Sequence, residues 1–190
     1  MPKVVDHEKR REEILARCFD LFAEHGYGAM TMRKLAKALG VSTGTLYHYF
    51  DGKPALFEAM FRWLRARDIQ TASEGLPEDA SQGERLARLG EFLKANQENL
   101  QQAVRVALDY HRHAPDADSR RFVAETVREY EMALRDQLGL TEHPELATVL
   151  LSFLLGMSVH GILDPDHVIV EHHLTVLGLA AQAVVGLEGT

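Results

Sequence analysis

The chain of 190 residues has few of the features that mark secreted, membrane-embedded or disulfide-stabilised proteins. A single cysteine, Cys18, excludes an internal disulfide, so a reducing cytoplasm is the expected compartment. No apolar run reaches the ~18–20 residues of a membrane span, because the longest, VLLSFLLGMSV, is interrupted by serine and glycine. The charged start, MPKVVDHEKRREEIL, lacks the apolar stretch of a secretory signal. We expect a cytoplasmic protein with no membrane partner.

Patterns that carry enzymatic chemistry are also missing. There is no glycine-rich phosphate loop and no ordered Ser/His/Asp set. Cys18 falls on an apolar helical stripe and is interpreted as core rather than nucleophile. Asp109 and His113 would share a helix face with His111 nearly opposite, which is a poor metal site. We expect no enzymatic activity, no metal and no bound cofactor.

Four further histidines lie near the end of the chain: His160, His167, His172 and His173. Imidazole is a common metal ligand, so a site assembled from them is an alternative. Their irregular spacing favours solvated or core-edge positions instead.

The net charge of -7 is unevenly distributed along the chain. Residues 1–65 hold 11 Lys and Arg against 8 Asp and Glu, a net of +3, whereas the remaining 125 residues hold 10 against 20, a net of -10. A mildly basic head on an acidic body indicates a different partner for each part. Chance variation of the surface would give the same split, so this observation needs support from motifs.

Strand-like alternation is nearly absent, and helical periodicity recurs along the chain. The first apolar stripe, at one-face helical spacing, consists of Ile14, Leu15, Cys18, Phe19 and Phe22. The glycines at 26 and 28 are expected to end this helix. Helical patterning follows at 32–39, 43–50, from about 53, from about 81 to 113, and at 118–138, 144–163 and 167–187. The sequence predicts an all-α protein of about nine helices.

The stretch VSTGTLYHYF, residues 41–50, places rings and hydroxyls side by side. In a short helix after an N-cap at Ser42, Leu46 and Phe50 share a packing face while Tyr47 and His48 point outward. Rings at helical spacing are usually core, and taken alone each residue favours that interpretation. The whole arrangement, two short helices joined by a glycine turn with a polar outer face, favours a helix-turn-helix.

The second helix of such a motif can lie in the DNA major groove, which is about 12 Å wide. Thr43 and Thr45 can offer hydroxyl and methyl contacts, and Gly44 allows close approach of the backbone. His48 and Tyr49 suit phosphate oxygens, and Tyr47 can reach a base or a phosphate. Flanking cations are present on both sides: Arg33 and Lys34 before the turn, and Lys53 at a helix start where phosphates bind.

From about Lys9 to Trp63 the sequence resembles the DNA-binding domain of the TetR family of bacterial transcriptional regulators. The matching residues are ILARCFDLFAEHGYGAMTMRKLAKALGVSTGTLYHYFDGKPALFEAM, in the first third of the chain. The resemblance implies a homodimer whose three-helix heads, each followed by a linking fourth helix, bind a palindromic double-stranded DNA operator. It also implies a helical C-terminal domain that binds a small-molecule effector and dimerises through its last two helices.

Carried over by position, the resemblance places a phosphate-contacting helix start on Thr31, a base-reaching cation on Arg33 and a phosphate lysine on Lys53. Met32 departs from the family pattern, which often has a second hydroxyl residue there. The candidate DNA-binding residues are Thr31, Arg33, Lys34, Ser42, Thr43, Gly44, Thr45, Tyr47, His48, Tyr49 and Lys53.

We therefore expect a helix-turn-helix domain at 8–68 and a ligand-binding and dimerisation domain at 69–190. The expected function is ligand-responsive transcriptional regulation, in the first place repression. Two apolar segments, LATVLLSFLLGMSVHGIL and LTVLGLAAQAVVGL, are either a buried monomer core or a dimer interface. The alternative function is a helical small-molecule or metal-binding protein whose head does not bind DNA. An acidic or apolar outer face on the second helix of the motif would favour that alternative.

Overall fold

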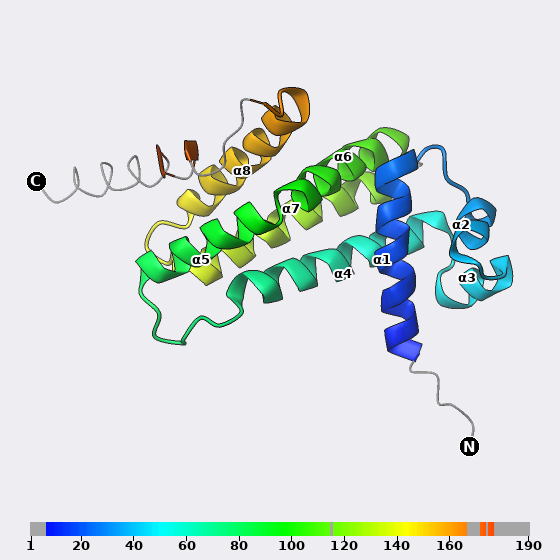
Figure 1. Ribbon diagram of the computed structural model, residues 1–190, viewed down its shortest axis with the longest axis horizontal. Coiled ribbons are helices and arrows are strands. Elements are labelled where there is room, and N and C mark those ends of the chain that lie inside the picture. The colour runs from blue at the N-terminus through cyan, green and yellow to red at the C-terminus, as the bar shows by residue number, and fades with distance from the viewer. Residues whose placement is uncertain (1–6, 115, 167–171, 174, 177–190) are drawn as a thin grey trace, which may run out of the picture. The chain divides into compact units, whose positions relative to one another are not determined.

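The computed structural model describes residues 7–114, 116–166, 172–173 and 175–176, and in that part it holds eight helices and no strand (Figure 1). The expected all-α class is confirmed. The helices are α1 His7–His25, α2 Met32–Leu39, α3 Thr43–Tyr49, α4 Lys53–Ser73, α5 Gln82–Ala95, α6 Gln97–His113, α7 Ala117–Leu138 and α8 Glu145–Leu163. The last helix, expected at 167–187, lies almost wholly outside the described residues.

The helices group into two compact units. The first comprises Met1–Gln70 and Arg105–Tyr130, and the second comprises Thr71–Val104 and Glu131–Thr190. The expected functional boundary between 68 and 69 lies close to the first division. The structural grouping adds the end of α6 and the start of α7 to the N-terminal head.

The helix ends in the N-terminal third lie where glycine and hydroxyl residues predicted them. Gly26 has a φ of 78°, and its N–H donates to the carbonyl of Phe22 at 2.9 Å, so it ends α1 in a left-handed conformation that glycine adopts without strain. Gly40, with a φ of 71°, ends α2 in the same way. Thr31 and Ser42 are the N-caps of α2 and α3.

The patterning predicted from about 81 to 113 is divided into two helices. Ser81 and Glu84 form the expected capping box at the start of α5, each side chain accepting the other's backbone N–H. The break lies at Asn96, whose backbone N–H and side-chain Nδ2 both donate to the carbonyl of Phe92, at 3.0 and 2.9 Å. Side-chain amides that compete for backbone groups favour helix ends. The apolar spacing continues across the break, which is why periodicity alone did not predict it.

The apolar stripe predicted for α1 is buried in the first unit, since Ile14, Leu15, Cys18, Phe19 and Phe22 are at most 4% exposed. Burial raises the pKa of the Cys18 thiol to about 12, so almost no thiolate forms near neutral pH. The helix α2 packs on both α1 and α3. These contacts build the three-helix head that the sequence predicts.

Five aromatic rings, here called the aromatic cluster, join the end of α1 to α4, α6 and α7 within the first unit. Tyr110 of α6 is fully buried and lies parallel to Phe57 of α4, with ring centroids 3.9 Å apart and planes 9° apart. Tyr27 meets Tyr110 and Phe57 edge-on at 4.8 and 5.1 Å. Phe22 and Phe122 extend the cluster. Each well-placed pair adds about 0.5–1.5 kcal/mol beyond its burial.

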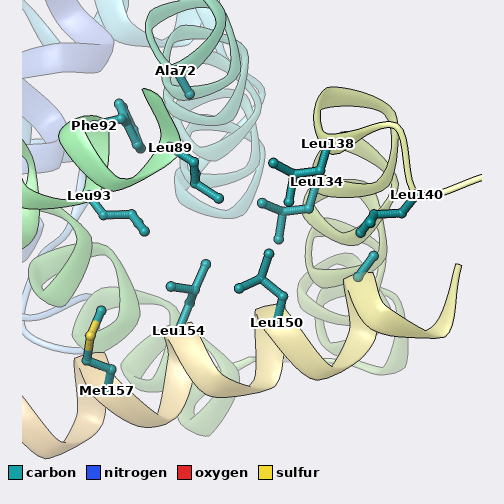
Figure 2. Close-up of a cluster of buried hydrophobic side chains, with 11 residues drawn as sticks. Ala72, Leu89, Phe92, Leu93, Leu134, Leu138, Leu140, Leu150, Leu154 and Met157 are labelled. Atoms are coloured by element: carbon teal, nitrogen blue, oxygen red, sulfur yellow. The ribbon is translucent and has the colours of Figure 1, made fainter. Parts of the chain in front are cut away.

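The second unit is built around a leucine-rich core that takes side chains from α5, α7 and α8 (Figure 2). Figure 2 shows Leu150, Leu154 and Met157 of α8 directed toward the side chains of α5 and α7. The core residues are Ala72, Leu89, Phe92, Leu93, Leu134, Leu138, Leu140, Ala147, Leu150, Leu154 and Met157. This core fixes one face of α8.

The opposite face of α8 is exposed and also carries apolar side chains. At about 100° per residue, the buried and exposed sets of α8 fall on opposite sides of the helix. The buried set is Ala147, Leu150, Leu154, Met157 and Gly161. Five residues of the exposed side, here called the α8 outer stripe, are Val149, Ser152, Gly156, Val159 and Leu163; the polar residues Glu145, Thr148 and His160 are exposed as well.

By length and composition α8 reaches what a membrane span needs, as the core helices of many soluble proteins also do. Among the described helices it is the one that meets this test. The expectation that serine and glycine interruptions keep every segment below that length is wrong for α8. Its scattered serine and glycine residues are too few to lower the mean hydropathy that the surrounding leucine, valine and isoleucine give the helix.

Replacing Leu93 by alanine should lower the free energy of unfolding by about 2–5 kcal/mol, because its side chain is 4% exposed and would leave a cavity in the leucine-rich core. Leu86, on the same helix but 38% exposed, is the matched control, and its replacement by alanine should cost less than about 1 kcal/mol. Urea unfolding followed by circular dichroism measures both. Equal losses would contradict the assignment of Leu93 to the core.

Candidate nucleic-acid interface

The helices α2 and α3 lie side by side, joined by the three-residue turn 40–42 (Figure 1). Within the turn, the backbone N–H of Val41 donates to the carbonyl of Ala36 at 3.0 Å. Ser42 follows directly and caps α3, so no flexible residue separates the two helices. This is the geometry of a helix-turn-helix, in which the second helix is presented to a DNA groove.

Arg17 of α1, which the sequence interpretation missed, bonds the backbone just before this turn. Its two terminal nitrogens donate to the carbonyls of Leu39 at 3.1 Å and Ala38 at 3.0 Å. These carbonyls lie at the end of α2, where no helical N–H is available to them. Arg17 therefore fixes the angle at which α3 follows α2. Helical periodicity in the sequence gives no sign of these partners, which lie more than twenty residues away.

The recognition helix α3 divides into faces as its spacing predicts. Leu46 is fully buried and Phe50, the C-cap, is 4% exposed, so these two side chains hold the helix on the head. Tyr47 is 53% exposed, and Gly44 and His48 are exposed beside it. The structure thus brings these three residues together on one outward surface.

The remaining predicted residues of α3 are half-buried or take part in its cap. Thr43, Thr45 and Tyr49 are half-buried. Ser42 Oγ accepts the Thr45 N–H at 2.9 Å and lies 2.8 Å from Thr45 Oγ1, so the two hydroxyls bond one another. A hydroxyl has one donor and two acceptor positions, which leaves each of them capacity for a further contact.

The start of α2 carries three further predicted DNA-binding residues, Thr31, Arg33 and Lys34. Thr31 Oγ1 accepts the Lys34 N–H at 3.2 Å, and Lys34 Nζ donates to the carbonyl of Ala29 at 2.8 Å. Arg33 is exposed and has no hydrogen-bond or ion-pair partner among the residues that the structure describes. Met32, which replaces the family's usual hydroxyl residue, is buried and packs the helix instead. Arg33 is therefore the cation of α2 whose guanidinium is available to a base edge.

Lys53 has a structural role that its sequence position did not reveal. Its Nζ donates to the carbonyls of Tyr27 and Met30, both at 2.9 Å, and lies 3.9 Å from the centroid of the Tyr27 ring. Burial lowers the pKa of Lys53, while the carboxylate of Asp109 acts in the opposite direction. The ammonium expected to meet a phosphate therefore also holds the turn between α1 and α2.

The end of α3 lies against the start of α1. The Tyr49 hydroxyl is 3.5 Å from His7 Nδ1, and the Arg11 guanidinium lies 5.4 Å from the centroid of the Phe50 ring. The start of α1, where Lys9, Arg10 and Arg11 are flanked by an equal number of glutamates, therefore lies near the recognition helix. The sequence interpretation did not include it, because its positions carry no motif.

The histidines contribute no metal site in the described ranges, where no three His, Cys, Asp or Glu side chains are arranged to hold an ion. Asp109 and His113 do share a face of α6, with His113 Nδ1 3.1 Å from Asp109 Oδ1. The rings of His160 and His173 lie 6.2 Å apart, and His167 lies outside the described residues.

The sequence comparison that is placed by residue falls in the head. Residues 14–60 match the model of the bacterial regulatory proteins of the tetR family. The HTH-type transcriptional repressor Rv1474c of Mycobacterium tuberculosis is 46% identical over 79 residues, which are 40% of this chain and 42% of that protein. Four curated relatives, all named HTH-type transcriptional repressors, are matched over only 34–42% of their own length.

Solved structures share the fold across most of the chain. A transcriptional regulator from Pseudomonas aeruginosa PAO1 has a TM-score of 0.76 at 19% identity, covering 95% of this chain and 92% of that one. The regulator FadR from Bacillus subtilis, solved in complex with stearoyl-CoA, has a TM-score of 0.65 at 19% identity, covering 87% of this chain and 95% of that one. At this identity the likeness concerns the fold alone.

Replacing Arg33 by alanine should relax base preference at one position of a bound DNA site by about 1–3 kcal/mol, because an unpaired guanidinium can bond a guanine edge at two points. Lys37→Ala, which removes another exposed charge from the same helix, should weaken all sequences alike. Selection from a randomised DNA library measures both preferences. Identical profiles for the two variants would exclude a base contact by Arg33.

Proposed function

Because the chain belongs to the tetR family of bacterial regulatory proteins, we propose that it is a ligand-responsive transcriptional regulator. It binds a palindromic double-stranded DNA operator as a homodimer and represses transcription by occupying that site. A small-molecule effector in the C-terminal domain releases it. Residues 8–68 form the DNA-binding domain and residues 69–190 the effector-binding and dimerisation domain.

The observation that carries this proposal is the outer surface of the helix-turn-helix. Tyr47, His48 and Gly44 are exposed on α3, whose apolar residues are buried, and the unpaired Arg33 is exposed on α2. The alternative, a protein whose head does not bind DNA, would be favoured by an acidic or apolar outer surface. This surface is neither acidic nor apolar. A major groove offers hydrogen-bonding base edges between two rows of phosphates, and these side chains suit both.

Each predicted residue has a contact that fits its surroundings. Gly44 lets the DNA backbone or a base edge approach closely, and the exposed Tyr47 reaches a base or a phosphate. Hydroxyls of Thr43 and Thr45 bond base edges, and those of Thr31 and Ser42 bond phosphates while they cap their helices. His48 and Tyr49 contact phosphate oxygens. Lys53 and the first N–H groups of α4 attract one further phosphate.

A second copy of the chain is the partner that the α8 outer stripe fits. Five small or apolar residues recur there at i, i+3, i+7, i+10 and i+14, the spacing of a helix-packing seam. Gly156 and Ser152 allow two helices to approach closely, and Val149, Val159 and Leu163 supply apolar area. Dimerisation would place two recognition helices about 34–36 Å apart, or a multiple of that, on successive turns of DNA.

Release by an effector needs a ligand that binds the DNA-free arrangement better than the DNA-bound one. The FadR structure with stearoyl-CoA is an example of the same fold holding a small molecule. Repression itself requires only that the dimer block access to the promoter, so no enzymatic step and no cofactor is involved. The role is that of a cytoplasmic protein with DNA, a second copy and an effector as its partners.

The decisive experiment is selection of DNA from a random library by the purified full-length chain. We expect an inverted repeat with half-sites about one helical turn apart, and an affinity that falls steeply with salt because each neutralised phosphate releases counterions. Fluorescence anisotropy at several salt concentrations measures the slope. Failure to enrich any double-stranded sequence in dilute buffer would reject the proposed function.

Val159→Glu should convert the dimer into a monomer, because it would place a carboxylate from each copy into an apolar seam at a cost of several kcal/mol. Operator affinity should fall with it, since one head alone makes half of the contacts. Leu86→Glu, which adds the same charge at an exposed position of α5, is the control. Light scattering after size-exclusion chromatography measures the mass, and a dimeric Val159→Glu protein would exclude α8 from the interface.

A further inference from the structure

The turn between α1 and α2 is bonded to α6, which lies about eighty residues further along the chain. Asp109 Oδ2 accepts the backbone N–H of Gly28 at 3.2 Å. Both residues belong to the first compact unit, so the bond lies within one body. A carboxylate that accepts a backbone N–H makes a charge-assisted bond, which is stronger than one between neutral groups.

Two glycines of the turn allow α6 to approach this closely. Gly28 lacks a positive φ, so its backbone conformation is open to any residue. A Cβ at position 28, however, would lie 2.8 Å from His113 Nε2, and one at Gly26 would lie 3.1 Å from Asp109 Oδ2. The His113 ring is itself held on α6, with its Nδ1 3.1 Å from Asp109 Oδ1. Glycine is favoured at position 28 because a side chain there would collide with His113 of α6, and not because the backbone conformation requires it.

The same turn carries the other contacts that connect the head to α4 and α6. The Tyr27 ring packs edge-on against Tyr110, and Lys53 bonds the carbonyls of Tyr27 and Met30. The next residue after this turn is Thr31, the N-cap of α2. A shift of the turn would therefore move α2, and with it α3, because the two reading helices are joined by only three residues.

We propose that Asp109 is a positioning residue for DNA binding: through the N–H of Gly28 it holds the turn 26–30 and so sets where α2 and α3 meet the operator. It touches no DNA. This inference rests on the proposed function for its consequence, but the bond itself can be tested without DNA.

The test compares Asp109→Ala with Asp109→Asn, two variants of equal charge that differ in whether an acceptor for the Gly28 N–H remains. Removing a carboxylate near DNA should by itself tighten binding, since it reduces repulsion of phosphates. Loss of position should weaken binding instead, so the two effects have opposite signs. We expect Asp109→Ala to bind the selected operator about tenfold more weakly than Asp109→Asn, which should match or exceed the unsubstituted protein.

Two further readouts separate positioning from a general loss of stability. In the protein without DNA, hydrogen exchange of the Gly28 amide, measured by NMR, should become about tenfold faster in Asp109→Ala and stay unchanged in Asp109→Asn. On operators whose half-site spacing is varied by single base pairs, Asp109→Ala should lose its sharp optimum. Urea unfolding identifies any variant that has simply lost its fold.

Gly28→Ala gives an independent measurement, because its methyl group pushes against the His113 ring. Its operator affinity should fall several-fold, and the double variant Gly28→Ala/His113→Ala should recover it by restoring the space. Unaltered Gly28 exchange in Asp109→Ala, equal affinities of the two Asp109 variants, or no recovery in the double variant would each overturn the inference. If the unsubstituted protein binds no DNA, the proposed function fails, and the exchange measurement still decides whether Asp109 holds the turn.

Discussion

The stacked contact between Tyr110 of α6 and Phe57 of α4 is the interaction on which the geometry of the first unit depends. The two rings are fully buried, and Tyr27 closes over both from the turn that follows α1. Burial of such rings contributes a large apolar area and fixes relative orientation, because only a few ring geometries are favourable. This cluster positions the helices α2 and α3, because only a short turn separates Tyr27 from the start of α2.

Polar side chains near the aromatic cluster bond the backbone of the turn 26–30 and of the end of α2, and so orient these segments. Lys53 bonds two carbonyls of the turn, Arg17 bonds the carbonyls that end α2, and Asp109 bonds the N–H of Gly28. Each bond satisfies a backbone group at a helix end or turn, and so favours one arrangement of the head. The candidate interface is therefore held in one arrangement by residues outside the predicted DNA-contacting set, apart from Lys53, which is also a predicted phosphate contact.

Local chemistry made much of the fold predictable. Glycines at helix ends, hydroxyl N-caps and a single-faced apolar stripe are signals that lie within one helix, so the end of α1 and both ends of α2 and α3 were predicted almost to the residue. The break at Asn96 was missed because apolar spacing continues across it. The outer stripe of α8 was ambiguous for a related reason: composition makes a helix apolar all round, but only the packing of Leu150 and Leu154 shows which face remains open.

By itself the sequence determined the helical class, the helix-turn-helix at 32–50 and the outward placement of Tyr47 and His48. Each of these follows from spacing along a single helix and from caps that act within four residues. Only the tertiary structure decided that Arg17 holds the end of α2, that Lys53 is engaged by the turn and that Asp109 reaches Gly28. These bonds join residues 21 to 81 positions apart. Periodicity shows which face of a helix points inward, but it does not show which distant backbone group that face will meet.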